Sequence, residues 1–398
     1  MEKREFRGER LKYARIFRAK SLTELANESG ISKQLISQYE NGDSRPSHER
    51  LFTISEILHF PYDFFMQGDL YSTHTDVTYF RSLMSAKRME RASQSYKLEI
   101  AVEIYKALQD EYVEFQSLNL PAVEFSGIDS DIDENTMAKA ACEIEQIANR
   151  LRIFWKLGDA PIDNLQYILE SNGIIVTGFP TDADGIDAFS QRTYVDGHDV
   201  FAIAVDQGTK PEGRIRFDLA HELGHILLHP WSESLEMITK EEFKMREKQA
   251  NMFASAFLLP ATTFRRDVQA YPTDLKYYLW LKKKWHVSVA AMLYRANQLG
   301  VITNNQFSYL MRQYSKNGWR RGEPDDYPFT LNENVFQGAI DILFEEHILT
   351  PASFMRFLKS RSIDLHADDI EEILHLRKGT LDVEETRPKV VRLKLIKE

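Results

Sequence analysis

The sequence contains a single cysteine, Cys142, among 398 residues. A lone cysteine cannot form a disulfide within the chain, and it excludes every zinc site that needs several thiolates. No run approaches the ~18–20 consecutive apolar residues that span a bilayer, so the sequence predicts no membrane partner. The N-terminus, MEKREFRGERLKYAR, lacks the apolar centre of a secretion signal, and we therefore expect a cytoplasmic protein.

The composition is that of a globular protein, with 43% apolar and 28% charged residues. A net charge of −10 argues against a protein that coats nucleic acid with its whole surface. Residues 1–20 depart from this balance, since they hold eight Lys or Arg against three Glu. This basic start is interpreted as a solvated helix face, with a small basic module as the alternative.

Hydrophobic periodicity predicts a mainly α-helical chain with a small β-sheet, an α+β fold. We expect strands at 173–178, 187–191 and 199–205. Helices are predicted at 136–155, 161–171, 212–229, 240–258 and 273–300, with two or three more within 332–378. In the 240–258 helix, Thr239 and Glu242 fit a capping box.

These elements divide the chain into four predicted parts. They are a group of five short helices at 1–66, a linker with a long helix at 67–135, a part with both strands and helices at 136–304 and a C-terminal helical part at 305–398. Residues 66–84 are predicted to be loop-like. The long helix, 85–116, carries a short apolar seam that either dimerises the protein or packs on the chain's own body.

Residues 20–60 have the shape of a DNA-reading unit, in which a turn at Gly30 joins two short helices. The second helix of such a unit enters the major groove of double-stranded DNA, and a homodimer is expected because one unit reads one half-site. Leu35, Ile36 and Tyr39 are predicted to face inward. The other side carries polar residues, which are suited to base edges and phosphates. The predicted operator contacts are Ser32, Lys33, Gln34, Ser37, Gln38, Asn41 and Arg45.

This stretch resembles the XRE family of repressor-like helix-turn-helix regulators. The likeness is carried by Leu25-Ala26, Gly30-Ile31-Ser32, Ile36-Ser37, Tyr39-Glu40-Asn41-Gly42 and Pro46. It implies that Arg15 of the first helix pairs with Glu40 as a structural element. The family's phosphate-binding glutamine falls on Leu22, so that anchor is missing. The alternative to DNA binding is a helical adaptor without DNA affinity.

The string HELGH at 221–225 predicts a metal site. On a helix, His221 and His225 lie one turn apart on the same face, so both imidazoles can reach one ion. A catalytic zinc needs a third protein ligand and an open position for water. Glu247 on the next predicted helix is the predicted third ligand, with a surface glutamate as the alternative. His229 lies ~12 Å along the helix from His221, too far to share its metal.

Supporting residues are predicted around this site. Asn251, one turn beyond Glu247, can accept a hydrogen bond from the second ring N–H of a ligand histidine. His229 is interpreted either as another residue that supports a ligand from outside the metal or as a helix-terminal residue. Gly224 is expected to clear room near the metal. Glu222 is the predicted general base, which takes a proton from water and passes it to the leaving amine. Two histidines and a glutamate fit Zn²⁺, and Mn²⁺ or Fe²⁺ stay open.

This region resembles the ImmA/IrrE family of metallopeptidases. The matching residues are Trp155-x-Leu157-Gly158-x-x-Pro161-Ile162, Asp187-Ala188-Phe189-Ser190, Arg216-Phe217, Leu219 to His225 with His229, Glu247-x-x-Ala250-Asn251-x-Phe253-Ala254, Leu258 to Pro260, Val287-Ser288 and Leu299-Gly300. The likeness implies a gluzincin-like zinc endopeptidase. Such enzymes cleave XRE-type repressors and release phage, mobile-element or stress genes.

Three functions follow from this combination. The first is a transcriptional regulator that cleaves an XRE-type repressor, or itself. The second is a regulator whose zincin domain senses metal or ligand without proteolysis, and the third is an antitoxin. Asp187 and Tyr194 either line the cleft or are structural. The loop with Trp319, Arg320 and Arg321 either binds an acidic partner or is a packed tryptophan with solvated arginines.

Overall fold

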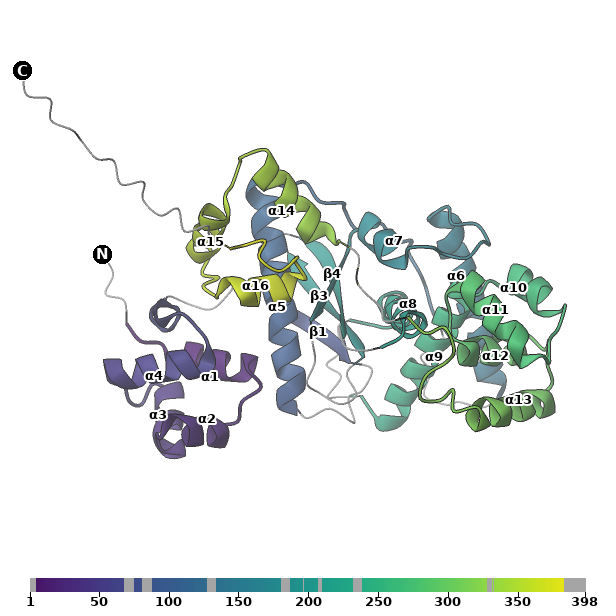
Figure 1. Ribbon diagram of the computed structural model, residues 1–398, viewed down its shortest axis with the longest axis horizontal. Coiled ribbons are helices and arrows are strands. Elements are labelled where there is room, and N and C mark those ends of the chain that lie inside the picture. Colours follow the sequence, from purple (N-terminus) through teal and green to yellow (C-terminus); the bar gives the residue numbers. More distant parts are fainter. Residues whose placement is uncertain are drawn as a thin grey trace, which may run out of the picture.

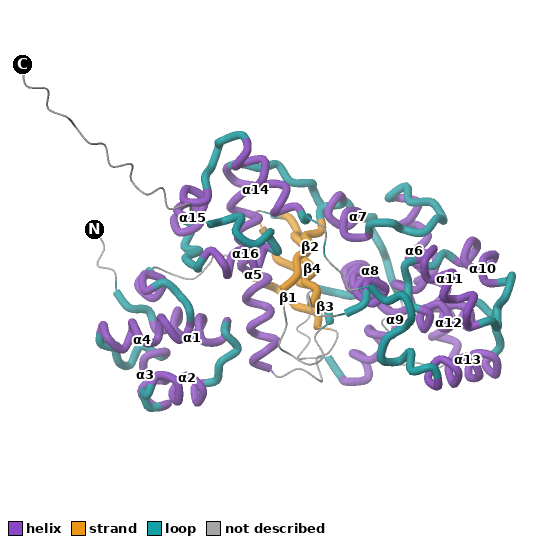
Figure 2. Tube along the Cα trace, in the orientation of Figure 1, coloured by secondary structure: helices purple, strands orange, loops and turns teal. Residues whose placement is uncertain are grey.

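The computed structural model confirms the α+β fold class, with many helices around one small sheet (Figures 1 and 2). The structure describes residues 5–67, 75–80, 88–126, 134–179, 187–195, 197–206, 210–231, 238–327, 331 and 333–382. Among these, no helix is long and apolar enough to cross a membrane.

The N-terminal helices form the predicted helix-turn-helix. They are α1 (Gly8–Phe17), α2 (Leu22–Ser29), α3 (Lys33–Glu40), α4 (His48–Leu58) and η1 (Tyr62–Met66). The fifth element is a 3₁₀ helix, entered from Pro61, rather than an α-helix. Ser21 and Glu24 form a reciprocal capping box at the start of α2, and Gly30 ends it with φ of 69°.

The basic start of the chain is largely structural. Arg15 makes the predicted bidentate pair with Glu40, with N–O distances of 2.6 and 2.8 Å. Arg10 is also buried, and Arg18 binds Asp369 near the far end of the sequence. These three arginines are therefore part of the packing and not of a solvated face, whereas Arg7 and Lys12 are exposed.

Helix α5 (Arg88–Glu111) runs through the middle of the molecule, between the helix-turn-helix and the sheet (Figure 1). Its first half packs on α1, where Tyr96 stacks on Tyr13 at 4.5 Å and Ser93 donates a hydrogen bond to the Phe17 carbonyl. Its seam residues, including Ala101 and Leu108, are buried against the chain itself. The seam therefore packs on the chain's own body.

The sheet has the order β1-β3-β4-β2 and separates two hydrophobic cores. Its strands are β1 (Thr75–Phe80), β2 (Ile174–Phe179), β3 (Ala188–Val195) and β4 (His198–Asp206), and only β2 and β4 pair in parallel. Ala202 and Ala204 face α5 and the C-terminal helices, whereas Phe201, Ile203 and Val205 face α8 (Glu212–Leu228). Successive side chains of β4 point to opposite faces of the sheet and so contribute to both cores.

Strand β1 corrects the prediction of a loop-like stretch at 66–84. Its sequence, TDVTYF, is rich in the β-branched and aromatic residues that favour strands. The strand is short and pairs only with β3, so its stability depends on a partner over 100 residues away. No local sequence pattern indicates which strand that partner is.

Most other helices follow the prediction. These are α6 (Glu134–Phe154), α7 (Leu165–Ser171), α9 (Lys240–Leu258), α14 (Val335–Glu345), α15 (Pro351–Ser360) and α16 (Ala367–Leu374). The predicted helix 273–300 is two helices, α11 (Leu275–Trp285) and α12 (Val289–Gln298), because His286 adopts a left-handed backbone with φ of 53°. Two helices were missed, α10 (Ala261–Val268) and α13 (Asn304–Lys316).

The predicted division at 66, 135 and 304 stays a prediction. One hydrophobic core joins the helix-turn-helix, α5, one face of the sheet and the C-terminal helices. The other core joins the opposite face of the sheet to α6 through α13.

Glu170, at the end of α7, ties this helix to the start of α14. Burial raises its pKa to about 8, against the opposing effect of hydrogen bonds from the Val335 N–H and Gln166. The pKa of this carboxyl is therefore higher in the folded chain than in the unfolded chain, where it is about 4.5. Proton binding by Glu170 stabilises the fold, and this contribution is complete below about pH 4.5. That contribution is lost as the pH rises through 8.

We therefore expect Glu170→Gln to unfold at a higher denaturant midpoint than wild type at pH 8. The amide keeps an oxygen for the Val335 N–H and carries no buried charge. The gain, on the order of a few kcal/mol, should shrink toward pH 5. Chemical unfolding followed from pH 5 to 8 measures it, with the exposed Glu345→Gln as control. A constant difference across this range would contradict the prediction.

Candidate metal centre and DNA-reading helix

Helix α8 carries the HELGH string in the interior of the molecule. It begins after Pro211 and ends at Leu228, where the extended backbone of His229 stops it. Leu219 and Leu223 are fully buried and fix the helix against its neighbours. The rings of His221 and His225 project from one face, as their spacing predicts, with centroids 4.7 Å apart.

Helix α9 lies against α8 and brings Glu247 to the two histidines. Thr239 accepts a hydrogen bond from the Glu242 N–H at the start of α9, but the Glu242 carboxylate binds Arg246 instead of closing the predicted capping box. Gly224 does not clear room for the metal as expected. A Cβ there would lie 3.2 Å from the Cα and carbonyl oxygen of Ala250, so the glycine lets the two helices pack closely.

Three side chains converge on one point. The Nε2 atoms of His221 and His225 are 3.0 Å apart, and Glu247 oxygens lie 3.4 and 3.1 Å from them. Ligand atoms at ~2.0–2.1 Å from a tetrahedral zinc stand ~3.3 Å from one another. The spacing and chemistry of this donor set therefore fit a zinc-sized ion.

The outward ring nitrogens are held in the tautomer that a metal ligand needs. His221 Nδ1 lies 3.1 Å from Asn251 Oδ1, so its N–H donates there and Nε2 keeps its lone pair. His225 Nδ1 lies 2.9 Å from His229 Nδ1, and His229 Nε2 lies 3.1 Å from Gln249 Oε1. Because the Gln249 oxygen can only accept, one arrangement of protons satisfies the whole row of side chains and leaves the lone pair of His225 on Nε2, the atom that faces Glu247.

The electrostatics of the site keep His229 neutral and Glu247 ionised. Burial lowers the pKa of His229 well below its usual value, helped by the nearby His225, so His229 stays neutral. Burial acts to raise the pKa of Glu247, but hydrogen bonds and charge from His221 and His225 outweigh it and lower that pKa to about 2. Glu247 is therefore an anionic donor at neutral pH.

Glu222 is fully buried, and its carboxylate accepts a hydrogen bond of 2.6 Å from the Ser190 hydroxyl on β3. Ser190 is a site residue that sequence reasoning did not assign, although it belongs to the Asp187–Ser190 run of the family likeness. Gln249 was also missed. Positions i and i+2 do not share a helix face, so the spacing of Gln249 from Glu247 gives no signal for its contact with His229.

The two weaker candidates on the sheet lie apart from this centre. Asp187 binds Lys210 at 2.5 Å and also pairs with Arg214, which fixes the start of β3 to α8. Tyr194 is 56% exposed and lies four residues beyond Ser190, roughly 13 Å along the strand. Asp187 thus has structural partners, and Tyr194 lies at the exposed far end of its strand.

The predicted DNA contacts gather on and beside α3. Ser32 caps the helix, while Lys33, Gln34 and Gln38 are exposed and Ser37 is half-buried. Ile36 and Tyr39 are buried as predicted, and Leu35 is half-buried. Beyond the helix, Asn41 is exposed at its C-terminal cap, and Arg45 is exposed and pairs with Glu5 at 3.0 Å.

Comparisons with known proteins agree with both motifs. Residues 11–65 match the helix-turn-helix family, and residues 173–297 match the family described as IrrE N-terminal-like domain. No curated protein matches the chain. The second match spans α8 and α9, and so includes the histidines and Glu247. The chain therefore joins a helix-turn-helix of the XRE type to a domain of the IrrE N-terminal-like family.

Proposed function

We propose that this protein is a DNA-binding transcriptional regulator with a zinc-dependent endopeptidase domain that cleaves an XRE-type repressor. The observation that carries the proposal is the convergence of His221, His225 and Glu247, with the buried Glu222 next to His221 on the same helix. The family match of residues 173–297 supports a peptidase, and the match of residues 11–65 supports DNA binding. Zinc fits the donor set, and Mn²⁺ or Fe²⁺ are the other candidates.

Each side chain has a defined part in hydrolysis. When bound, zinc supplies Lewis-acid chemistry that lowers the pKa of water and stabilises negative charge on a carbonyl oxygen. Glu222 takes a proton from the attacking water and delivers it to the leaving amine nitrogen. Ser190 orients the Glu222 carboxylate through its 2.6 Å hydrogen bond. Asn251 and His229 hold the two histidine rings in place.

The proposal is tested by incubating the zinc-loaded protein with the XRE-type repressor encoded beside it. We expect new termini in the repressor by mass spectrometry, and we expect EDTA to suppress them and added zinc to restore them. Cleavage of the chain itself would appear in the same spectra. A repressor that stays intact, together with DNA binding that changes on zinc addition, would favour the second candidate function, a metal-sensing regulator without proteolysis. The tethered helix-turn-helix favours that alternative, because it suits a regulator more than a diffusing protease.

The DNA-binding part has a separate test at α3. Replacing Lys33, Gln34 and Gln38 together with alanine should remove operator preference at fixed salt, because each good base contact contributes ~1–3 kcal/mol of discrimination. Lys12→Ala, an exposed cation on α1, is the matched control. Electrophoretic shifts with operator and scrambled duplexes measure the ratio of affinities. An unchanged ratio in the triple variant would rule out this helix as the reader. A dimer on two half-sites stays a prediction.

A further inference from the structure

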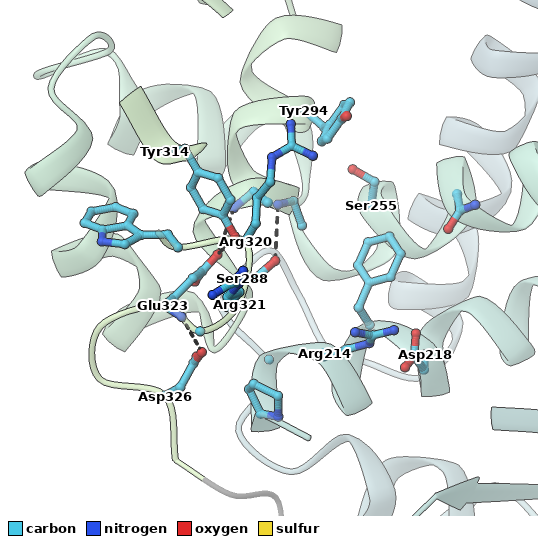
Figure 3. Close-up of a pocket in the computed structure, with 18 of the residues that line it drawn as sticks. Arg214, Asp218, Ser255, Ser288, Tyr294, Tyr314, Arg320, Arg321, Glu323 and Asp326 are labelled. Carbon is cyan, nitrogen blue, oxygen red and sulfur yellow. Dashed lines mark hydrogen bonds between the residues drawn. The ribbon is translucent and has the colours of Figure 1, made fainter. Parts of the chain in front are cut away.

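A cavity of about 690 Å³ lies beside the candidate metal centre (Figure 3). Its walls come from α8, α9, α12 and the loop that follows α13, so it lies between the two helices of the metal centre and the C-terminal end of the second core. Asn251, whose oxygen contacts His221, is part of its wall. Asp218 is another wall residue, one turn before His221 and Glu222 on α8.

The floor of the cavity is apolar. Phe217 on α8, Met252 on α9 and Tyr294 on α12 line it together with small residues at the start of α12. Tyr294 is 60% exposed, and this fraction is high for an aromatic residue beside a cavity. A pocket of this size and lining can hold one or two apolar side chains of a ligand.

The loop after α13 is fastened to α12 and so holds its own side chains in place. Glu323 accepts hydrogen bonds from the backbone N–H groups of Val289 and Ala290, at 2.9 and 3.2 Å, and from the Tyr314 hydroxyl at 2.9 Å. Lys282 lies 3.0 Å from the same carboxylate. The segment from Trp319 to Glu323 is thus preorganised over the cavity.

Cations of this loop and of α9 line the cavity. Arg320 and Arg321 lie with Tyr314 on one side of it, and Arg214 and Asp218 lie on the other (Figure 3). Lys248 belongs to the same wall. In the part of the chain that the structure describes, none of Lys248, Arg320 and Arg321 forms an ion pair with a carboxylate.

The lining also holds three acidic residues, Asp218, Glu323 and Asp326. Lys282 pairs with both Glu323 and Asp326, and Arg214 pairs with Asp187. Four cations of the lining thus stand against these three acids, which leaves an excess of one positive charge on a chain whose net charge is −10. Such an excess attracts anionic ligands.

We propose that this cavity binds an acidic segment of the peptide substrate, with an apolar side chain in the floor and Asp or Glu facing Lys248, Arg320 and Arg321. This inference rests on the proposed peptidase function and names its substrate class. Asp218 and Asn251 stand about one helical turn, ~5.4 Å, from metal-ligand positions on α8 and α9. Arg320 and Arg321 lie across the cavity from Asp218 (Figure 3), so we expect the acidic residues a few positions from the cleaved bond, and the test scores three positions on each side.

The test uses the full-length, zinc-loaded chain and a library of peptides from a digested proteome. Wild type should enrich Asp and Glu within three positions of the new termini. The charge-reversed variant Arg320→Glu with Arg321→Glu should lose this enrichment and favour Lys and Arg there. Arg312→Ala with Lys316→Ala, exposed cations on α13 outside the cavity, is the matched control and should cut like wild type. Cleavage without acidic enrichment, or an unchanged preference after charge reversal, would overturn the proposal.

A binding measurement separates this proposal from the proposed function. Two fluorescein-labelled peptides carry either two glutamates or two glutamines after a phenylalanine, and anisotropy reports their affinities for the Glu222→Gln variant. The acidic peptide should bind about three- to tenfold tighter at low salt, and the difference should vanish when Arg320 and Arg321 are reversed. Equal affinities would overturn the proposal. If the acidic peptide binds more tightly but the wild-type protein cleaves nothing, the assignment of the cavity is retained and the peptidase function is rejected.

Discussion

Replacing Glu222 with glutamine is expected to lower the rate of repressor cleavage by about 10²–10⁴-fold and to leave zinc content unchanged. The amide has the same shape, and its oxygen can still accept the hydrogen bond from the Ser190 hydroxyl. It cannot take a proton from water, and general-base catalysis contributes a factor of this size. The change also removes a charge from a fully buried position, so the fold should not suffer.

The measurement compares cleavage rates and metal content of the two proteins under the same zinc loading. Glu212→Gln, in the first turn of the same helix and partly exposed, is the matched control and should cut at the wild-type rate. Ser190→Ala should show a smaller loss than Glu222→Gln, because it frees the carboxylate without removing it. A Glu222→Gln protein that cuts as fast as wild type would show that another group acts as base.

Local periodicity explains how much of this centre could be predicted. The spacing of His221 and His225 specifies one helix face without knowledge of the fold. Glu247 needed one further step, the expectation that the next helix folds back on α8. Asn251 followed from Glu247 by helical spacing. The two histidines and the Glu247–Asn251 pair rest on four-residue spacing, and the step from His225 to Glu247 crosses only one connection between consecutive helices.

The parts that were missed depend on distant segments. Ser190 reaches Glu222 across 32 positions, from a strand to a helix, and no local pattern marks it as a partner. The docking of the helix-turn-helix on the C-terminal helices is more remote still, since Arg18 binds Asp369. Gly224 was correctly singled out but given the wrong neighbour, because its role depends on the position of Ala250 in the packed pair.

The same distant contacts bear on how the two functions are connected. Helix α5 carries Ser93, bonded to α1 of the DNA-reading unit, and Ser95, whose hydroxyl accepts a hydrogen bond from Gln191 at 3.2 Å. Gln191 is the neighbour of Ser190 on β3. The helix-turn-helix is thus packed on the scaffold that positions Glu222.

Removing the Glu247 carboxylate should have the second large effect. In the Glu247→Ala protein only His221 and His225 remain, so we expect zinc affinity to fall on the order of 10³-fold, about 4 kcal/mol. Excess zinc at 1,000 times its Kd stabilises a folded protein by ~4.1 kcal/mol, and this gain should largely disappear from the variant. Competition with a chromophoric chelator gives the affinity, and thermal unfolding with and without zinc gives the stabilisation.

The control for this change is Glu241→Ala, an exposed residue in the first turn of α9. It removes the same charge from the same helix and should bind zinc like wild type. His221→Ala should match Glu247→Ala, because each removes one of three donors. If Glu247→Ala keeps wild-type affinity while His221→Ala loses it, the third donor lies elsewhere. The geometry argues against that result, since both Glu247 oxygens already stand within 3.4 Å of the histidine nitrogens.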